Sequence, residues 1–280
     1  MRMPSVSPRH AFYRCAAVLL LFWLVALLAG PALLNALDLS FNPHGHTRLH
    51  PHGHPFVDAR TLLGLPNAMD VLSNLPLSLA GLWGMLVFRG RLLPGTTRQA
   101  ARVFFAGLLL TGLGSAWYHW APDAAGLVWD RLGMAVTFSG ALALAVAERV
   151  GQVPARQTLR VLLPLALLSA ILPASSGNVL PWAVVQFGGM ALIVWLALRK
   201  SVVGAIGIRL GVLMGLYGLA KWLEFGDEAV FHATADTVSG HSLKHCAAAC
   251  AAWPVIAALA PQRRVRAPAS LRQNAPRRAA

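Results

Sequence analysis

Long apolar stretches dominate the chain and alternate with short polar segments. A helix needs about 20 apolar residues to cross a bilayer. Eight stretches have this character, with few or no charged residues: 15–37, 67–88, 101–120, 126–148, 158–174, 179–198, 203–223 and 234–259. Strands are not expected, because open sheet edges cannot face lipid and the runs are too long for barrel strands. The pattern predicts an all-α polytopic membrane protein.

The first stretch admits two interpretations. It follows a basic segment, and small residues surround Ala32, as in a signal peptide. Its apolar run is nevertheless longer than the roughly 7–15 residues of a signal-peptide core. We interpret it as a retained N-terminal transmembrane helix added to a seven-helix core. Cleavage would leave that core with the same orientation.

The composition excludes two other classes of protein. Of the 280 residues, 56% are hydrophobic and only 12% are charged, whereas a soluble domain carries about 25% charged residues. A soluble globular enzyme and a disordered chain are therefore both excluded. The three cysteines, Cys15, Cys246 and Cys250, lie in apolar stretches and imply no disulfide framework.

The basic residues fall on one side of the predicted helices. Of the 24 Lys and Arg residues, 19 lie before the first stretch, in alternate loops or in the C-terminal tail, and Glu148 is the only acidic residue on that side. The positive-inside rule then places both termini in the cytoplasm, and we expect a bacterial inner-membrane protein. The net charge of +14 reflects this topology and an attraction to anionic lipid near the Arg-rich loops. No nucleic-acid partner is expected, and the oligomeric state stays open.

Four segments follow from these patterns. Residues 1–37 form a cytoplasmic segment and the extra helix, and residues 67–260 form the seven-helix core. Residues 261–280 are an Arg-rich tail, predicted to be disordered and cytoplasmic. Residues 38–66 form an outer loop, which either traps metal or is simply polar. It holds five histidines: His44, His46, His50, His52 and His54.

Ionisable residues within the membrane converge on the outer end of the predicted bundle. Ser115 and His119 are four residues apart at the outer end of the third stretch, and so share one helix face. Asp130 follows across a short turn, and helices joined so closely pack side by side. His241 and His245 are also four residues apart, near the outer start of the last stretch. Three segments that are distant in sequence are thus predicted to meet at one depth.

These residue types indicate a metal site. Three imidazoles with one open position form a catalytic zinc arrangement. Two histidines at i and i+4 can bind one zinc ion, as in the HExxH helix, although the glutamate of that motif is absent here. We therefore predict one Zn²⁺ per chain, held by His119, His241 and His245. Asp130 would move protons or orient a ligand, and Ser115 would donate a hydrogen bond to a developing oxyanion.

Each residue also has a plainer interpretation. A histidine at a helix end is usually interfacial, and the HxxxH spacing occurs by chance. Ser115 can be a small packing residue, or bond to a carbonyl of its own helix. Asp130 can pair with the arginine that follows it, or cap the start of its helix. Another polar cluster, formed by Lys221, Glu224 and Asp227, is either an ion-pair network or a rim for a lipid headgroup.

The combined pattern resembles the signature of the CREST superfamily of seven-helix membrane proteins. That group contains alkaline ceramidases, progestin/adiponectin-type receptors, haemolysin-III-like proteins and GPI-processing membrane hydrolases. The segment PNAMDVLSNLPLSLAGLWG, with Asn67, Ser73 and Asn74, is similar to the first core helix of the ceramidase branch, as are SGHSLKH and the spacing from histidine to aspartate. The likeness runs from about Asp58 to Trp253 and fits a bacterial-type member.

The resemblance implies a seven-helix core that holds zinc through the same three histidines, with the serine and the aspartate in the surrounding shell. In alkaline ceramidases such a site hydrolyses the amide of ceramide to a sphingoid base and a fatty acid. Eukaryotic members bind calcium through an acidic stretch before the first core helix. Here that stretch offers Asp58 and Asn67 but no glutamate, so we predict no calcium site.

The expected function is an integral membrane, zinc-dependent hydrolase that cleaves the amide bond of a ceramide-like N-acyl lipid. The alternative is a receptor or sensor of the same superfamily, with structural zinc. A metal transporter, motivated by the His-rich loop, is less favoured. The stretches 158–174 and 179–198 carry little polarity beyond Gln186, which argues against a conduction path.

Overall fold

The computed structural model describes residues 7–37 and 56–260, which are mainly helical and contain no β-strand. The His-rich segment before residue 56 and the tail after residue 260 lie outside the described residues. The helices are α1 (Pro8–Ala36), α2 (Ala68–Leu72), α3 (Leu75–Val87), α4 (Gly95–Trp120), α5 (Ala124–Arg149), α6 (Gln152–Ser176), α7 (Leu180–Ala183), the π-helix η1 (Val184–Gly188), α8 (Gly189–Ala197), α9 (Leu210–Phe225), α10 (Asp227–Ala233), α11 (Gly240–Cys250) and α12 (Trp253–Leu259).

The described residues hold seven helices that are long and apolar enough to cross a membrane. Four of them are single helices, namely α1, α4, α5 and α6. The other three join consecutive segments: α2 with α3, α7 with η1 and α8, and α11 with α12. The prediction of an all-α polytopic membrane protein is thus confirmed. The remaining predicted stretch, 203–223, corresponds to α9, which has only 16 residues and packs against α11.

The late start of α9 has two causes, the backbone conformation of two glycines and a buried carboxylate that binds the segment. Gly204 and Gly207 have φ values of +81° and +89°, a conformation that interrupts a helix. The buried carboxylate of Glu148 accepts hydrogen bonds from the three backbone N–H groups of residues 206–208, at 2.7 to 3.0 Å. This pairing replaces the bonds that a helix would supply. The helix therefore begins at residue 210, not at 203 as predicted.

The helices that carry the site are also interrupted. Ser73 and Asn74 separate α2 from α3, within a stretch predicted to be one helix. The last stretch was predicted to begin at residue 234, but Ala235 and Asp236 have positive φ, and α11 begins only after Ser239. The Ser239 hydroxyl accepts a hydrogen bond from a backbone N–H of the first turn, as an N-cap does.

Glycines set the closest helix pair, α4 with α5. They recur seven residues apart, at 107 and 114 on α4 and at 126, 133 and 140 on α5. A Cβ atom at Gly133 would lie 2.4 Å from the backbone nitrogen of Thr111, and one at Gly114 would lie 2.5 Å from the carbonyl oxygen of Trp129. Small residues let membrane helices approach this closely. The pairing brings the end of α4 against the start of α5.

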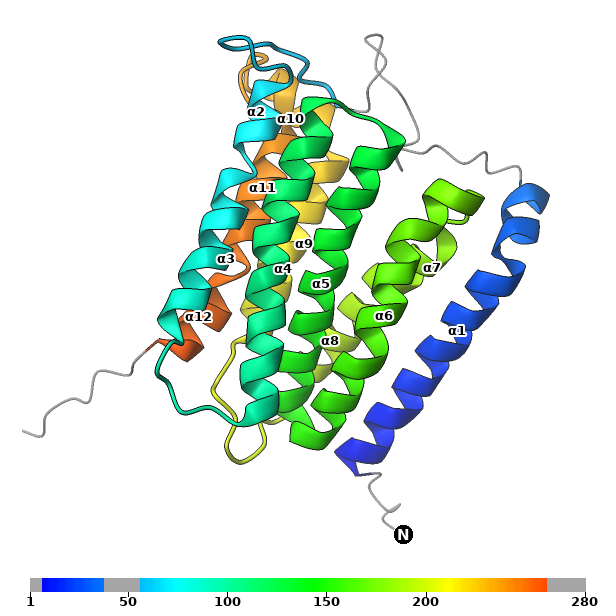
Figure 1. Cartoon of the computed structure of the whole chain (residues 1–280), viewed down its shortest axis with the longest axis vertical. Coiled ribbons are helices and arrows are strands. Elements are labelled where there is room, and N and C mark those ends of the chain that lie inside the picture. The colour runs from blue at the N-terminus through cyan, green and yellow to red at the C-terminus, as the bar shows by residue number, and fades with distance from the viewer. Residues whose placement is uncertain (1–6, 38–55, 261–280) are drawn as a thin grey trace, which may run out of the picture.

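The bundle has two distinct ends (Figure 1). The short helices α2 and α10 lie at one end, and α12 lies at the other. The junctions between α3 and α4, α5 and α6, and α8 and α9 lie at the α12 end, where the described arginines concentrate: Arg89, Arg91, Arg98, Arg149, Arg156 and Arg199. The charge asymmetry along the sequence is therefore an asymmetry between the ends of the bundle.

The first helix packs at the edge of the bundle (Figure 1). The indole N–H of Trp23 donates to the hydroxyl of Ser169 on α6 at 2.8 Å. The amide of Asn178, just before α7, donates to the carbonyl of Ala26 at 2.9 Å. These buried hydrogen bonds join α1 to the core at two neighbouring levels.

Candidate metal centre

Three histidines from two distant parts of the chain meet at the α2 end of the bundle. His119 lies in the last turn of α4, and His241 and His245 lie in the first two turns of α11. One ligand atom from each lies within 4.8 Å of those of the other two, and the side chains are 2%, 1% and 5% exposed. No carboxylate or thiolate of the described residues belongs to this group. The structure therefore confirms that the predicted ligands come together as a cluster that could hold a metal ion.

The spacing and the donor set both suit a zinc ion. The Nε2 atoms of His119 and His241 lie 3.3 Å apart. Two nitrogens bound tetrahedrally to one zinc at about 2.0–2.1 Å are about 3.3–3.4 Å apart. Neutral imidazoles are ligands that zinc prefers, although copper, nickel and iron also accept them. The distance between these two nitrogens thus matches tetrahedral zinc, while the donor set also accepts other metals.

A serine orients one of the ligands. The Ser73 hydroxyl lies 2.7 Å from Nδ1 of His245 and donates its own proton to the carbonyl of Asp70 at 3.1 Å. Because that proton is already used, Ser73 can only accept from the imidazole, and Nδ1 of His245 carries the hydrogen. The lone pair is then on Nε2. Partners of this kind fix the tautomer and the ring orientation of metal-binding histidines.

Asp70 was not a predicted site residue, yet it lies directly behind this serine. Its carboxylate is fully buried, and Oδ1 accepts hydrogen bonds from the hydroxyls of Ser242 at 2.8 Å and Ser239 at 3.3 Å. No described residue is a hydrogen-bond partner of Oδ2. The aspartate joins α2 to the start of α11, where two of the three histidines lie.

Phe56 covers the cluster. Its ring centroid lies 4.4 Å from that of His119 and 4.2 Å from that of His241, and the side chain is fully buried. The carboxylate of Asp227 holds the adjoining backbone, since it accepts from the N–H of His241 at 2.8 Å and from that of Val57 at 3.4 Å. Water is kept from this face of the histidines. Asp227, predicted to belong with Lys221 and Glu224 to an ion-pair network or a lipid-headgroup rim, therefore binds backbone groups at the site.

The two residues predicted to be catalytic lie on neighbouring helices. Ser115 is buried one turn before His119, and Asp130 lies on α5, which packs against α4. The two helices are in close contact here, because a Cβ atom at Gly114 would lie 3.2 Å from the Asp130 backbone nitrogen. Asp130 does not cap its helix, since the α5 N-cap is Asp123.

A charged network adjoins the site. The Glu224 carboxylate binds the ammonium of Lys244 at 2.7 Å and also that of Lys221, which is three residues before it on α9. The predicted pairing of Lys221 with Glu224 is confirmed. Lys244 was missed, because it lies on another helix, directly before His245. The charges of Lys244 and Glu224 both act on Asp130, so the network sets the electrostatic field at that carboxylate.

Comparisons with models of protein families, with curated proteins and with solved structures found no match.

Proposed function

We propose that this protein is an integral membrane, zinc-dependent hydrolase that cleaves the amide bond of a ceramide-like N-acyl lipid and releases a fatty acid. The observation that carries the proposal is the cluster of His119, His241 and His245. Three imidazoles leave one tetrahedral position of a zinc ion open, which is the arrangement of catalytic rather than structural zinc sites. The substrate class comes from the resemblance of the sequence motifs to those of alkaline ceramidases.

When bound, zinc would supply a Lewis acid and a water of lowered pKa. The carboxylate of Asp130 is the group of the chain suited to carry a proton to the amide nitrogen as the C–N bond breaks. Ser115 lies one turn before His119 on the helix that packs against α5. Its hydroxyl would donate a hydrogen bond to the developing oxyanion or orient Asp130.

The surroundings of the histidines suit this chemistry. Phe56 excludes water from one face of the imidazoles, and a dry site strengthens every electrostatic interaction within it. Lys244 and Glu224 contribute opposite charges near Asp130. The site also lies at one end of the candidate membrane-crossing helices, and we propose that this end is at the level where the polar part of a lipid meets its chains. An N-acyl amide in a bilayer lies at that level.

A second function is favoured by one observation, the burial of all three imidazoles beneath Phe56. A closed site is typical of structural zinc, as a receptor or sensor of the same superfamily would hold. Such a protein would bind zinc and would not turn over lipid.

One experiment separates the two functions. The purified, zinc-loaded protein would be incubated in bilayers with a panel of N-acyl lipids, and fatty acid and free amine would be quantified. His245→Ala is the control, because it removes one metal ligand. Release of equal amounts of both products by the intact protein alone would support the hydrolase. Retained zinc without any release would instead support the structural site.

A further inference from the structure

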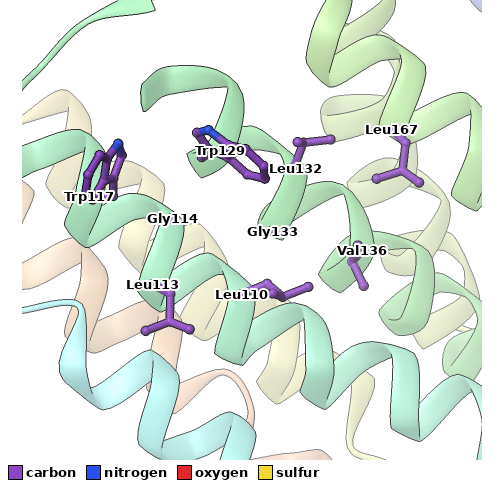
Figure 2. Close-up of a pocket in the computed structure, with 9 residues that line it drawn as sticks. All are labelled: Leu110, Leu113, Gly114, Trp117, Trp129, Leu132, Gly133, Val136 and Leu167. Carbon is purple, nitrogen blue, oxygen red and sulfur yellow. The ribbon is translucent and has the colours of Figure 1, made fainter. Parts of the chain in front are cut away.

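An apolar groove runs along the outer face of the α4–α5 pair (Figure 2). One wall is formed by Leu110, Leu113 and Trp117 of α4, and the other by Trp129, Leu132 and Val136 of α5. In both helices these positions are i, i+3 and i+7, so each wall is a continuous row about 10 Å long. Leu167 of α6 closes one side.

The lining and the size restrict what can bind there. The groove encloses about 520 Å³, and its only polar side-chain atoms are the two indole nitrogens. Pockets of about 300–1,000 Å³ hold small ligands. All three helices that line the groove are candidate membrane spans. A charged or strongly hydrated ligand would lose its hydration without compensation, so the ligand is a hydrocarbon.

The groove is not shaped for another helix. Membrane helices associate through small residues that let two backbones approach. The two glycines in the groove, Gly114 and Gly133, already bring α4 and α5 together. A Cβ atom at Gly114 would contact the backbone of Trp129, and one at Gly133 would contact the backbone of Thr111. What remains exposed is two rows of bulky side chains. Such walls fit a thin, flexible chain better than a rigid cylinder.

The tryptophans give the groove a direction. Trp117 lies three residues before the end of α4, and Trp129 lies in the second turn of α5, so both mark the metal-centre end. Tryptophan prefers the membrane–water interface, where its N–H can reach polar groups. A lipid bound in the groove would have its headgroup at this end and its chain toward the middle of the membrane.

We propose that this groove binds one acyl chain of a membrane lipid, separately from the metal centre. Ser115 and His119 point into the bundle, where they are buried, whereas Leu113 and Trp117 lie on the opposite, exposed side of the same helix. The chain bound in the groove is therefore not a substrate at the histidines. The proposal does not depend on the hydrolase activity.

The test uses the full-length protein in bilayers of unlabelled phosphatidylcholine. A trace of phosphatidylcholine with a photoreactive diazirine in one acyl chain is added, and the cross-linked peptides are mapped after irradiation. We expect peptides covering 110–117 and 129–136 to be labelled several-fold more than the exposed face of α3 around Leu79 and Leu82. Equal labelling of all exposed faces would mean ordinary surrounding lipid and would overturn the proposal.

Two variants sharpen the result. Val136→Trp fills the groove, and we expect it to remove most of the labelling there. Val161→Trp makes the same change at an exposed position of α6 outside the groove and should leave the labelling unchanged. If Val136→Trp prevents folding, Leu113→Trp replaces it, because that side chain is exposed at the groove edge. Undiminished labelling in a folded groove-filling variant would contradict the proposal.

Discussion

The Ser73 hydroxyl lies 2.7 Å from Nδ1 of His245, although 172 residues separate them in the chain. Ser73 lies in the break between α2 and α3, and its own proton goes to the carbonyl of Asp70. The interrupted helix thus presents a pure acceptor to the imidazole. The break in α2–α3 is therefore part of the candidate metal centre, because a continuous helix would place this side chain differently.

Replacing Ser73 by Ala should weaken zinc binding. Loss of a partner that orients a metal-binding histidine costs about 10–100-fold in metal affinity. The affinity would be measured by competition with a chromogenic chelator. Ser175→Ala is the matched control, because this exposed serine at the end of α6 bonds only within its own helix. An unchanged affinity in the Ser73 variant would show that the serine does not orient the ligand.

Replacing His241 by Ala should remove zinc altogether. The loss of a ligand should exceed the roughly 10–100-fold effect of losing its hydrogen-bond partner, and bound zinc would be measured by mass spectrometry of the dialysed protein. His232→Ala serves as the control, since this exposed histidine on α10 pairs with Asp236 away from the cluster. Stoichiometric zinc in the His241 variant would refute the three-histidine assignment.

Asp130→Asn should lower lipid hydrolysis by about 10²–10⁴-fold, the usual contribution of a positioned proton-transfer group. Zinc content should stay near that of the unchanged protein, because the aspartate is outside the ligand group. Turnover and zinc would be measured on the same preparation, with the exposed Asp236→Asn as the control. Full activity of the Asp130 variant would exclude this residue from the mechanism.

Gly133→Ala should destabilise the bundle by about 1–3 kcal/mol, the cost of overpacking a close contact. The added methyl group would lie 2.4 Å from the backbone of Thr111. Gly215→Ala on α9 is the matched control, since no atom lies within 4 Å of its Cβ position, and it should be neutral or stabilise by about 0.5–1 kcal/mol. Thermal unfolding in detergent would compare the two. Equal melting temperatures would contradict the proposed role of the glycines.

The topology can be tested by reporter fusions. A fluorescent protein that folds only in the cytoplasm should be bright when fused after Ala280 and dark when fused after Pro122, between α4 and α5. The reason is that the arginines gather at the other end of the bundle from Pro122, and the positive-inside rule places them in the cytoplasm. The reverse result would invert the predicted orientation.

Local patterns in the sequence were sufficient to predict the helices and the pairs of residues that share one helix face. Apolar length identified the membrane-crossing segments, and a spacing of four residues placed His241 and His245 on one face. The predicted start of α9 was wrong by seven residues, because residues 203–208 continue the hydrophobic pattern while Glu148 pairs with the backbone of residues 206–208. Hydrophobicity alone does not reveal such a pairing between distant residues.

The surroundings of the histidines were harder to predict. The sequence indicated Ser73 only as part of a family motif, and it did not predict Asp70 at the site. Lys244 lies between two predicted ligands and was not itself predicted to take part. Phe56 lies within the predicted outer loop 38–66, two residues after its last histidine, and carried no signal of its own. Each of these contacts joins residues at least 20 positions apart, and no sequence periodicity specifies such a contact.

The sequence by itself thus determined the class of the protein, most of its long apolar helices and the identity of the three histidines. These depend on hydrophobic burial and helical periodicity, which act over a few turns of the chain. Only the tertiary structure decided that Ser73 orients His245, that Phe56 covers the cluster and that Asp70 joins α2 to the start of α11. Those relationships depend on how α2 meets α11, and such distances are set by packing between helices rather than within them.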